Sequence, residues 1–452
     1  MPIGEPFSAA GITGIRRHRT AVNHAPQSLS PFDAAAILIV LAAALGYLNH
    51  RLFKLPTSVG LTLMGALASF IVIALDWIMP SRHLSEIVVK FLASIDFHTT
   101  LMDGMLSFLL FAGALHVDWT EMRRARLPIF VLSTVGVLLS TAIVGGGFWA
   151  ISTMLDVGVP LIWCVVFGAL ISPTDPVAVM AVLQRAAVPP TLRAVVAGES
   201  LFNDGVGVVV FTIVLTSALG LESFSLGTAG SVFLKEAGGG VLLGGAIGWL
   251  AFRAMRSIDE YSVEVMISLA VVMGGYSVAR WVHVSGPVAM AVAGLIIGNH
   301  GVAHAMSDVT RDYLIKFWGL VDEILNAVLF LLIGLEVIAI APDARVLALG
   351  ALCVLLVVIA RFVSVALPLA LMRPVFSLGT LGTPTLVWGG LRGGISIALA
   401  LSLPDSAVRT TILAATYVVV MFAVVVQGGT VGLLIKRLSP KPDQPAGTHG
   451  QH

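Results

Sequence analysis

The sequence is dominated by a succession of apolar stretches, each long enough to cross or nearly cross a lipid bilayer. A transmembrane helix needs about 20 residues at a rise of 1.5 Å per residue, and roughly 13 stretches meet or approach that length. The chain is therefore expected to be an all-α polytopic membrane protein. The expected segments cover residues 33–49, 57–79, 98–116, 128–154, 161–184, 192–219, 229–255, 262–282, 285–299, 311–340, 345–372, 381–403 and 408–435.

The composition agrees with a protein that is surrounded by lipid. Of the 452 residues, 57% are hydrophobic and only 11% are charged, which is too little charge to cover a soluble surface of that size. The formal net charge of +1 gives no basic face for a nucleic acid. Cys164 and Cys353 both lie in apolar runs, so we interpret them as packing residues and expect neither a disulfide nor a cofactor.

The basic residues predict the orientation of the chain. Of the 26 Lys and Arg, about 15 fall on the side that holds the C-terminus and about 9 on the other, and positive charge gathers in the cytoplasm. We expect a cytoplasmic C-terminus, with a short tail over 437–452, and an N-terminus outside. Residues 1–30 are polar and lack the apolar core of a cleaved signal peptide, so they are expected to form a tail.

Two arginines, Arg361 and Arg392, lie inside apolar segments. A charge at bilayer depth costs at least about 2.5 to 3.5 kcal/mol, so each should face a partner or a water-filled cavity. A structural ion pair between helices is the alternative to a role at a transport site.

A helix break is predicted in the segment 161–184. The run Ser172-Pro173-Thr174-Asp175-Pro176 contains two prolines, which remove backbone donors and disfavour helix before them. Irregular backbone survives at membrane depth only where protein or a water-filled cavity surrounds it. Its freed carbonyl oxygens, together with Asp175, are therefore expected to bind a cation.

The next segment carries a polar face. Glu199 and Asn203 are four residues apart, as are Ser200 and Asp204, so their side chains share one side of a helix. Carboxylate, hydroxyl, amide and carbonyl oxygens are the ligands that a hard cation requires. Burial disfavours a bare carboxylate, so Asp204 is expected to hold either a proton or a cation.

Three motifs carry a resemblance to a known family. The runs SPTDPVAV (172–179), GESLFND (198–204) and GLRGGISIAL (390–399) are similar to those of the NhaP-type sodium/proton antiporters. The resemblance implies that Thr174, Asp175, Ser200 and Asp204 hold the cation. It also implies that four residues structure the site, with Glu199 paired to Arg361 and with Arg392 at the dipole ends of its own broken helix: Glu199, Asn203, Arg361 and Arg392.

The same resemblance implies 13 transmembrane helices in two inverted repeats, with helices 5 and 12 broken and crossing. The repeats would span residues 31–220 and 261–436, with a linking segment over 228–256. The glycine-rich run 389–394 then corresponds to the proline-flanked break in the first repeat, and paired interruptions are typical of a transport site. A homodimer in lipid is the expected assembly.

The sequence therefore predicts a secondary antiporter that exchanges sodium for protons by alternating access, one for one, and serves pH homeostasis. Sodium, lithium and potassium are all hard monovalent cations, so a potassium/proton antiporter is the first alternative. A cation channel is the second, although channel filters are usually repeated around a symmetry axis. No enzyme is expected, because no catalytic Ser/His pair or HExxH motif occurs at a plausible spacing. The expected location is a bacterial inner membrane.

Overall fold

The computed structural model describes residues 31–79, 83–94, 100–186, 188–221, 225–301, 306–339, 344–373 and 376–438. Over these ranges every regular element is a helix, and no β-strand occurs. Eight helices are long and apolar enough to cross a membrane, and shorter apolar helices accompany them. The expected all-α membrane fold is confirmed. The polar tail expected at 1–30 lies outside the described residues, as does the tail expected at 437–452 except for its first two residues, which belong to the last helix.

The predicted segments coincide with helices whose ends mostly lie within a few residues of the expected ones. The unbroken or nearly unbroken helices are α1 (Pro31–Leu48), α2 (Thr57–Ile78), α5 (Leu106–Leu115), α7 (Arg126–Met154), α10 (Pro190–Ala218), α11 (Leu226–Phe233), α12 (Gly239–Met255), α13 (Tyr261–Trp281), α14 (Gly286–Ile296), α16 (Asp308–Leu335), α17 (Ala344–Met372), α20 (Ala407–Phe422) and α21 (Gly428–Leu438).

Two helices were not predicted, α3 (Leu84–Ser94) and α6 (Trp119–Arg124). The 11 residues of α3 cover about 17 Å, which is well short of a bilayer core of about 30 Å. Neither helix therefore adds a membrane crossing by its own length. The count of 13 crossings and the inverted repeats stay predictions.

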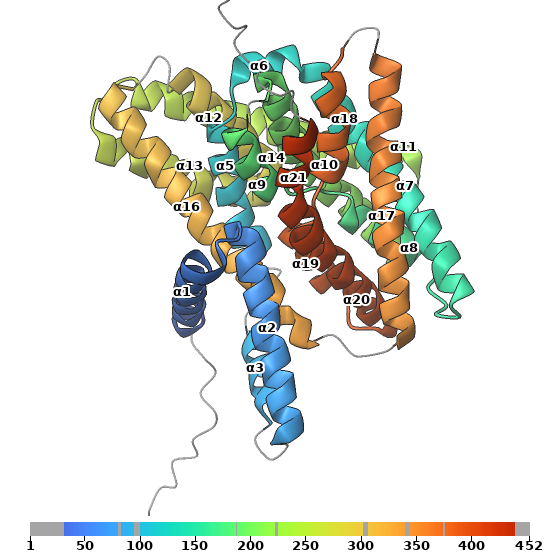
Figure 1. The fold of residues 1–452 in the computed structure, drawn as a ribbon. Coiled ribbons are helices and arrows are strands. Elements are labelled where there is room, and N and C mark those ends of the chain that lie inside the picture. Colours follow the sequence, from blue (N-terminus) through green and yellow to red (C-terminus); the bar gives the residue numbers. More distant parts are fainter. Residues whose placement is uncertain are drawn as a thin grey trace, which may run out of the picture.

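The helices gather in two groups (Figure 1). Two hydrophobic clusters lie among them, and α5, α14 and α16 contribute buried side chains to both. One cluster is formed by buried side chains of α5, α12, α13, α14 and α16, where the rings of Phe111 and Trp318 lie 4.6 Å apart. The larger cluster joins α7, α8 (Leu161–Ile171), α10, α17 and α20, and its helices pack directly on one another. The first group is called the α12–α16 bundle and the second the α7–α20 bundle below.

Many large apolar side chains lie on the outside of both bundles. Leu242 of α12 and Leu355 of α17 are 76% and 61% exposed. Such surfaces are costly in water and stable in lipid tails. This pattern supports the assignment as a membrane protein independently of helix length.

Two helices are interrupted near the middle of the molecule. The first consists of α8 (Leu161–Ile171) and α9 (Val177–Arg185), and the second of α18 (Gly379–Trp388) and α19 (Gly394–Leu401). Both interruptions fall where the sequence predicted them. A single antiparallel bridge pairs Asp175 in the first break with Leu391 in the second, so the two broken helices cross there.

Candidate ion-binding site at the crossing of two broken helices

The crossing is held by one backbone hydrogen bond. The amide of Asp175 donates to the carbonyl oxygen of Leu391 over 2.9 Å. Pro173 and Pro176 carry no amide hydrogen, so the stretch between them cannot continue the helical hydrogen bonds of α8. The bond to Leu391 satisfies a backbone donor that the break leaves free.

Asp175 lies two residues before α9, the second half of its broken helix. Its Oδ1 accepts a hydrogen bond of 2.9 Å from the amide of Val177, as N-terminal capping residues do. A Cβ atom at Gly393 would overlap Oδ2 and Cβ of Asp175, so the carboxylate packs directly on the backbone of the other break. Only glycine allows this approach at position 393.

The polar face of α10 forms hydrogen bonds with the first break. Asn203 Nδ2 donates to Thr174 Oγ1 over 2.7 Å and to Glu199 Oε1 over 2.9 Å, while its Oδ1 accepts a 3.3 Å bond from the amide of Thr174. Ser200 Oγ donates to the carbonyl oxygen of Thr174. All four side chains are buried. Asn203 is therefore a fixed link, with all of its amide groups engaged.

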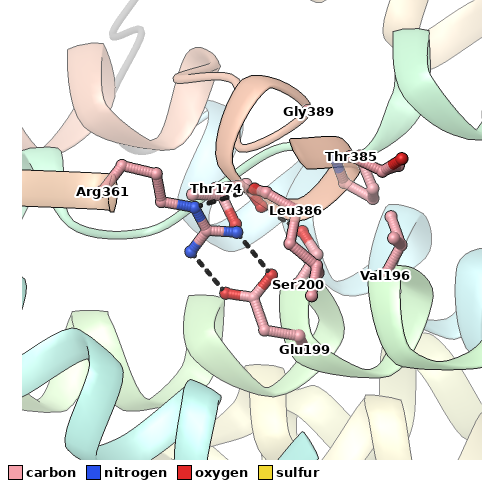
Figure 2. A pocket seen from close by; sticks show the side chains of 9 residues that line it. Thr174, Val196, Glu199, Ser200, Arg361, Thr385, Leu386 and Gly389 are labelled. Atoms are coloured by element: carbon pink, nitrogen blue, oxygen red, sulfur yellow. Dashed lines mark hydrogen bonds and ion pairs between the residues drawn. The ribbon is translucent and has the colours of Figure 1, made fainter. Parts of the chain in front are cut away.

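Glu199 and Arg361 form a buried bidentate ion pair. Both guanidinium nitrogens, Nη1 and Nη2, lie 2.9 Å from the two carboxylate oxygens, and Nε donates to the carbonyl oxygen of Leu386 over 3.1 Å (Figure 2). Parallel paired bonds of this kind are the strongest that a carboxylate forms with arginine. A Cβ atom at Gly390 would overlap Nε, so glycine is needed there as well.

Arg392 does not compensate its own broken helix as the sequence predicted. Its Nη1 donates to the carbonyl oxygens of Ser172 and Pro173, the latter over 3.0 Å. These carbonyls lie at the C-terminal end of α8, where a cation is favoured by the helix dipole. The expectation was wrong in its partner because the crossing places Arg392 of one break directly at the helix end of the other.

Asp204 differs from Asp175 and Glu199, whose carboxylates both accept hydrogen bonds. It is 7% exposed, and its Oδ1 is buried without a hydrogen-bond partner in the described part of the chain. Asp175 and Glu199 lie close enough to act on it electrostatically, and both carry negative charge when ionised. A buried carboxylate without a donor is strongly disfavoured as a bare anion. The geometry therefore leaves a place for a proton or a cation at Asp204.

The backbone oxygens of the break are less available than the sequence suggested. The carbonyls of Ser172 and Pro173 accept from Arg392, and that of Thr174 accepts from Ser200. Each carbonyl has a second lone pair, but one is already used. The least committed oxygens at the crossing are those of the two aspartates.

A small pocket lies beside the ion pair rather than between the aspartates. Figure 2 shows Arg361 and Glu199 on its wall, with Ser200 and Thr385 nearby. Sequence reasoning missed three positions: the carbonyl of Leu386, and Gly390 and Gly393 as contact points. The glycine-rich run signalled the break itself, but a backbone carbonyl carries no sequence signal. The pocket is lined by Thr174, Pro176, Val196, Glu199, Ser200, Arg361, Thr385, Leu386 and Gly389.

Comparison with known proteins identifies the family. The model of the transmembrane sodium/hydrogen exchangers matches residues 38–437, which is most of the chain. The chain belongs to the sodium/hydrogen exchanger family. The matched range contains both broken helices and all eight predicted site residues.

Individual relatives agree with this assignment. The chain is 43% identical to the Na⁺/H⁺ antiporter NhaP of Pseudomonas aeruginosa over 418 residues, which cover 90% of this chain and 96% of the relative. It is 33% identical to NhaH of Halobacillus dabanensis over 89% of this chain and 97% of that protein. The structure of MjNhaP1 from Methanocaldococcus jannaschii matches with a TM-score of 0.69 at 20% identity, over 90% and 99% of the two chains, and supports the fold.

Proposed function

We propose that this exchanger transports sodium into or out of the cell in return for protons, and that both ions compete for Asp204. The observation that carries the proposal is the buried Oδ1 of Asp204, which has no donor in the described residues although the neighbouring Glu199 has a bidentate arginine. Membership in the exchanger family and the likeness to antiporters of the NhaP type support the choice of ions.

The proposed cation ligands are Asp175 and Asp204, assisted by Thr174 and Ser200. A carboxylate pair that has bound one cation or one proton carries one negative charge fewer than the empty pair, so the loaded site can switch its exposure from one side of the membrane to the other more readily, which couples the two ions. Glu199, Asn203, Arg361 and Arg392 would keep the crossing in shape. Alternating access would come from movement of the α7–α20 bundle, which holds the site, against the α12–α16 bundle.

The proposed setting is a bacterial inner membrane, with a cytoplasmic C-terminus and an external N-terminus, as the distribution of basic residues favours. We also propose a homodimer in lipid and a role in pH homeostasis. No cofactor is needed for the exchange itself, since the transported ions supply the charge.

Replacement of Asp204 by asparagine tests the proposal. The amide keeps the volume of the side chain but cannot titrate, so D204N should fold and insert normally and lose sodium-driven proton flux in proteoliposomes. Ser217→Ala, more than three turns away on α10, is the matched control and should retain the flux. Substantial exchange by D204N would remove Asp204 from the transport site.

A further inference from the structure

Outside the crossing, one helix of the α12–α16 bundle carries a fully buried carboxyl group. Glu264 lies in the first turn of α13 and is 0% exposed. Both of its side-chain oxygens are buried, and neither has a hydrogen-bond partner in the described part of the chain. Glu199, the buried glutamate of the crossing, has a bidentate arginine. Glu264 is therefore not a member of a structural ion pair of that kind, and the exchange proposed above does not use it.

Two contacts place Glu264 between α13 and α16, which lie side by side (Figure 1). The rings of Tyr261 of α13 and Tyr313 of α16 stack with their centroids 4.5 Å apart. Further along both helices, Trp318 Nε1 of α16 donates to Ser268 Oγ of α13 over 2.9 Å. Glu264 follows Tyr261 by three residues and precedes Ser268 by four, so the three share one side of α13. Glu264 thus faces α16 between two fixed contacts.

The buried side chains of α16 at this level offer no free donor to the carboxyl group. Leu314, which lies between Tyr313 and Trp318 in the sequence, is 0% exposed and apolar. The indole N–H of Trp318 already donates to Ser268. Thr310 Oγ1, nearer the start of α16, donates to Asp259 Oδ1 over 3.3 Å. Both buried side-chain donors among residues 308–318 are thus engaged with other acceptors.

The charged residues near Glu264 are exposed, and none forms a salt bridge with it in the part of the chain that the structure describes. The negative charge of Asp259, in the loop before α13, acts on Glu264 and adds to the cost of a bare anion. Two other helices that pack on α13, α5 and α14, contain no charged residue. The exposed charged or titratable residues at this end of the elements around α13 are Arg253, Arg256, His116, Asp259, Glu260, Asp308, Arg311, Asp312 and Lys316.

A carboxyl group in such surroundings favours its neutral form. A buried anion without a donor loses its hydration and gains no hydrogen bond in return, whereas a carboxylic acid has no charge to desolvate. Side chains of a helix lean toward its N-terminus, so the carboxyl group of Glu264 lies toward the exposed end of α13, where water can deliver or accept a proton. In the orientation proposed above, this end faces the cytoplasm.

We propose that Glu264 is a second proton-binding site, separate from the crossing, and that its proton keeps α13 packed on α16. When the proton passes to water, the charge left between the helices draws water in and loosens the end of the pair where Tyr261 stacks on Tyr313. The packing of the α12–α16 bundle then depends on the pH at that face. The inference does not depend on which cation is exchanged.

Infrared difference spectra test whether Glu264 carries a proton. At about pH 6 an exposed glutamate is ionised, since its ordinary pKa is about 4.3. The wild type in sodium-free detergent solution should then show the carbonyl band of a protonated carboxylic acid that Glu264→Gln lacks, and this band should fade as the pH rises. Glu260→Gln, at an exposed position four residues earlier, is the matched control and should keep the band. Identical spectra of the wild type and Glu264→Gln in this region would overturn the proposal.

Thermal unfolding tests whether the proton stabilises the packing. The folded wild type would hold a proton at Glu264 that the unfolded chain releases, so this residue makes stability fall as the pH rises, and glutamine cannot titrate. The ratio of the unfolding constant of the wild type to that of Glu264→Gln should therefore increase with pH, by up to about tenfold per unit. Glu260→Gln should follow the wild type. A ratio that is the same at every pH would contradict a proton at Glu264.

A second neutral variant keeps this test decisive. Glu264→Met has a side chain of similar length without hydrogen-bonding groups, and it should fold and show the same pH-independent behaviour as Glu264→Gln. Failure of both variants to fold would contradict a neutral group at this position.

Sodium-driven proton flux in proteoliposomes separates this site from the transport site. Glu264→Gln should keep the flux at neutral pH within about twofold, since the ligands proposed at the crossing are unchanged. A folded Glu264→Gln protein without flux would place Glu264 on the transport path and overturn a separate site. A wild type that moves no protons with sodium would refute the proposed exchange alone, because the infrared and unfolding measurements need no transport.

Discussion

Glu199 and Asp204 lie on the same helix, yet their carboxylates have opposite surroundings. Both oxygens of Glu199 meet Arg361, while Oδ1 of Asp204 has no donor in the described residues. The charge of a carboxylate that is paired with arginine is already compensated. A buried carboxylate oxygen without a donor is stabilised when a proton or a cation binds to it. The difference assigns an architectural role to the first and an exchange role to the second.

The architectural role predicts the behaviour of the ion pair under mutation. Removing one member of a buried pair costs about 3 to 5 kcal/mol because the survivor is left uncompensated. Glu199→Ala and Arg361→Ala should each lower the thermal stability in detergent, and the double variant should lose less than the sum. Arg373→Ala, at an exposed position just after α17, is the control. Additive losses in the double-mutant cycle would show that the pair contributes no coupling.

The residues of the site could be predicted from the sequence, but some of their hydrogen-bond partners could not. The pairing of Glu199 with Arg361 was expected from the family resemblance and is present. The predicted partner of Arg392 was wrong, because its long side chain reaches the carbonyls of Ser172 and Pro173 in the other break once the helices cross. The distance between the two breaks is a tertiary property that periodicity does not contain.

The two broken helices meet through backbone as much as through side chains. Asp175 bonds to Leu391, and glycines at 390 and 393 admit Arg361 and Asp175 to the backbone of the second break. The breaks were predictable because proline and clustered glycine interrupt helices for local reasons. The short helices α3 and α6 were missed because neither has the length or the apolar run that marks a crossing.

Close approach at the crossing predicts a strong effect of one methyl group. Gly393→Ala would place Cβ against the Asp175 carboxylate, so the crossing should shift and the maximal rate of exchange should fall by tenfold or more, on the order of 1.4 kcal/mol. Gly146→Ala on α7 is the control, because nothing lies within 4 Å of the added atom. Full activity in the variant at 393 would mean that the crossing tolerates rearrangement.

For the molecule as a whole, the site in the α7–α20 bundle faces a second bundle with its own core. Two clusters allow two groups of helices to move against each other while most contacts inside each group are kept. The helices α5, α14 and α16 contribute side chains to both clusters, so their contacts would change most. The sequence could indicate the helices but not this division, since the partners of each helix face are set by distant segments. The inverted repeats and the dimer stay predictions.

Charge balance over one cycle predicts that transport is electroneutral. Asn203 cannot titrate, and Glu199 is held by Arg361, so one proton and one sodium ion would exchange at Asp204. A net charge per cycle is worth about 2.3 kcal/mol per 100 mV. The ion gradients at equilibrium should therefore not shift with an imposed potential, and no steady current should appear on a solid-supported membrane. A voltage-driven shift would mean that Asp175 also carries a proton.

Proton release on sodium binding tests the central claim, competition of both ions for Asp204, most directly. Calorimetric titration of the purified protein with sodium, in buffers of different ionisation enthalpy, counts the protons released per ion bound. At a pH where the site is protonated, binding should release about one proton per sodium ion, and affinity should weaken about tenfold for each unit decrease in pH. D204N should show neither release nor this dependence. Sodium binding that is equally tight at every pH and releases no proton would contradict competition at Asp204.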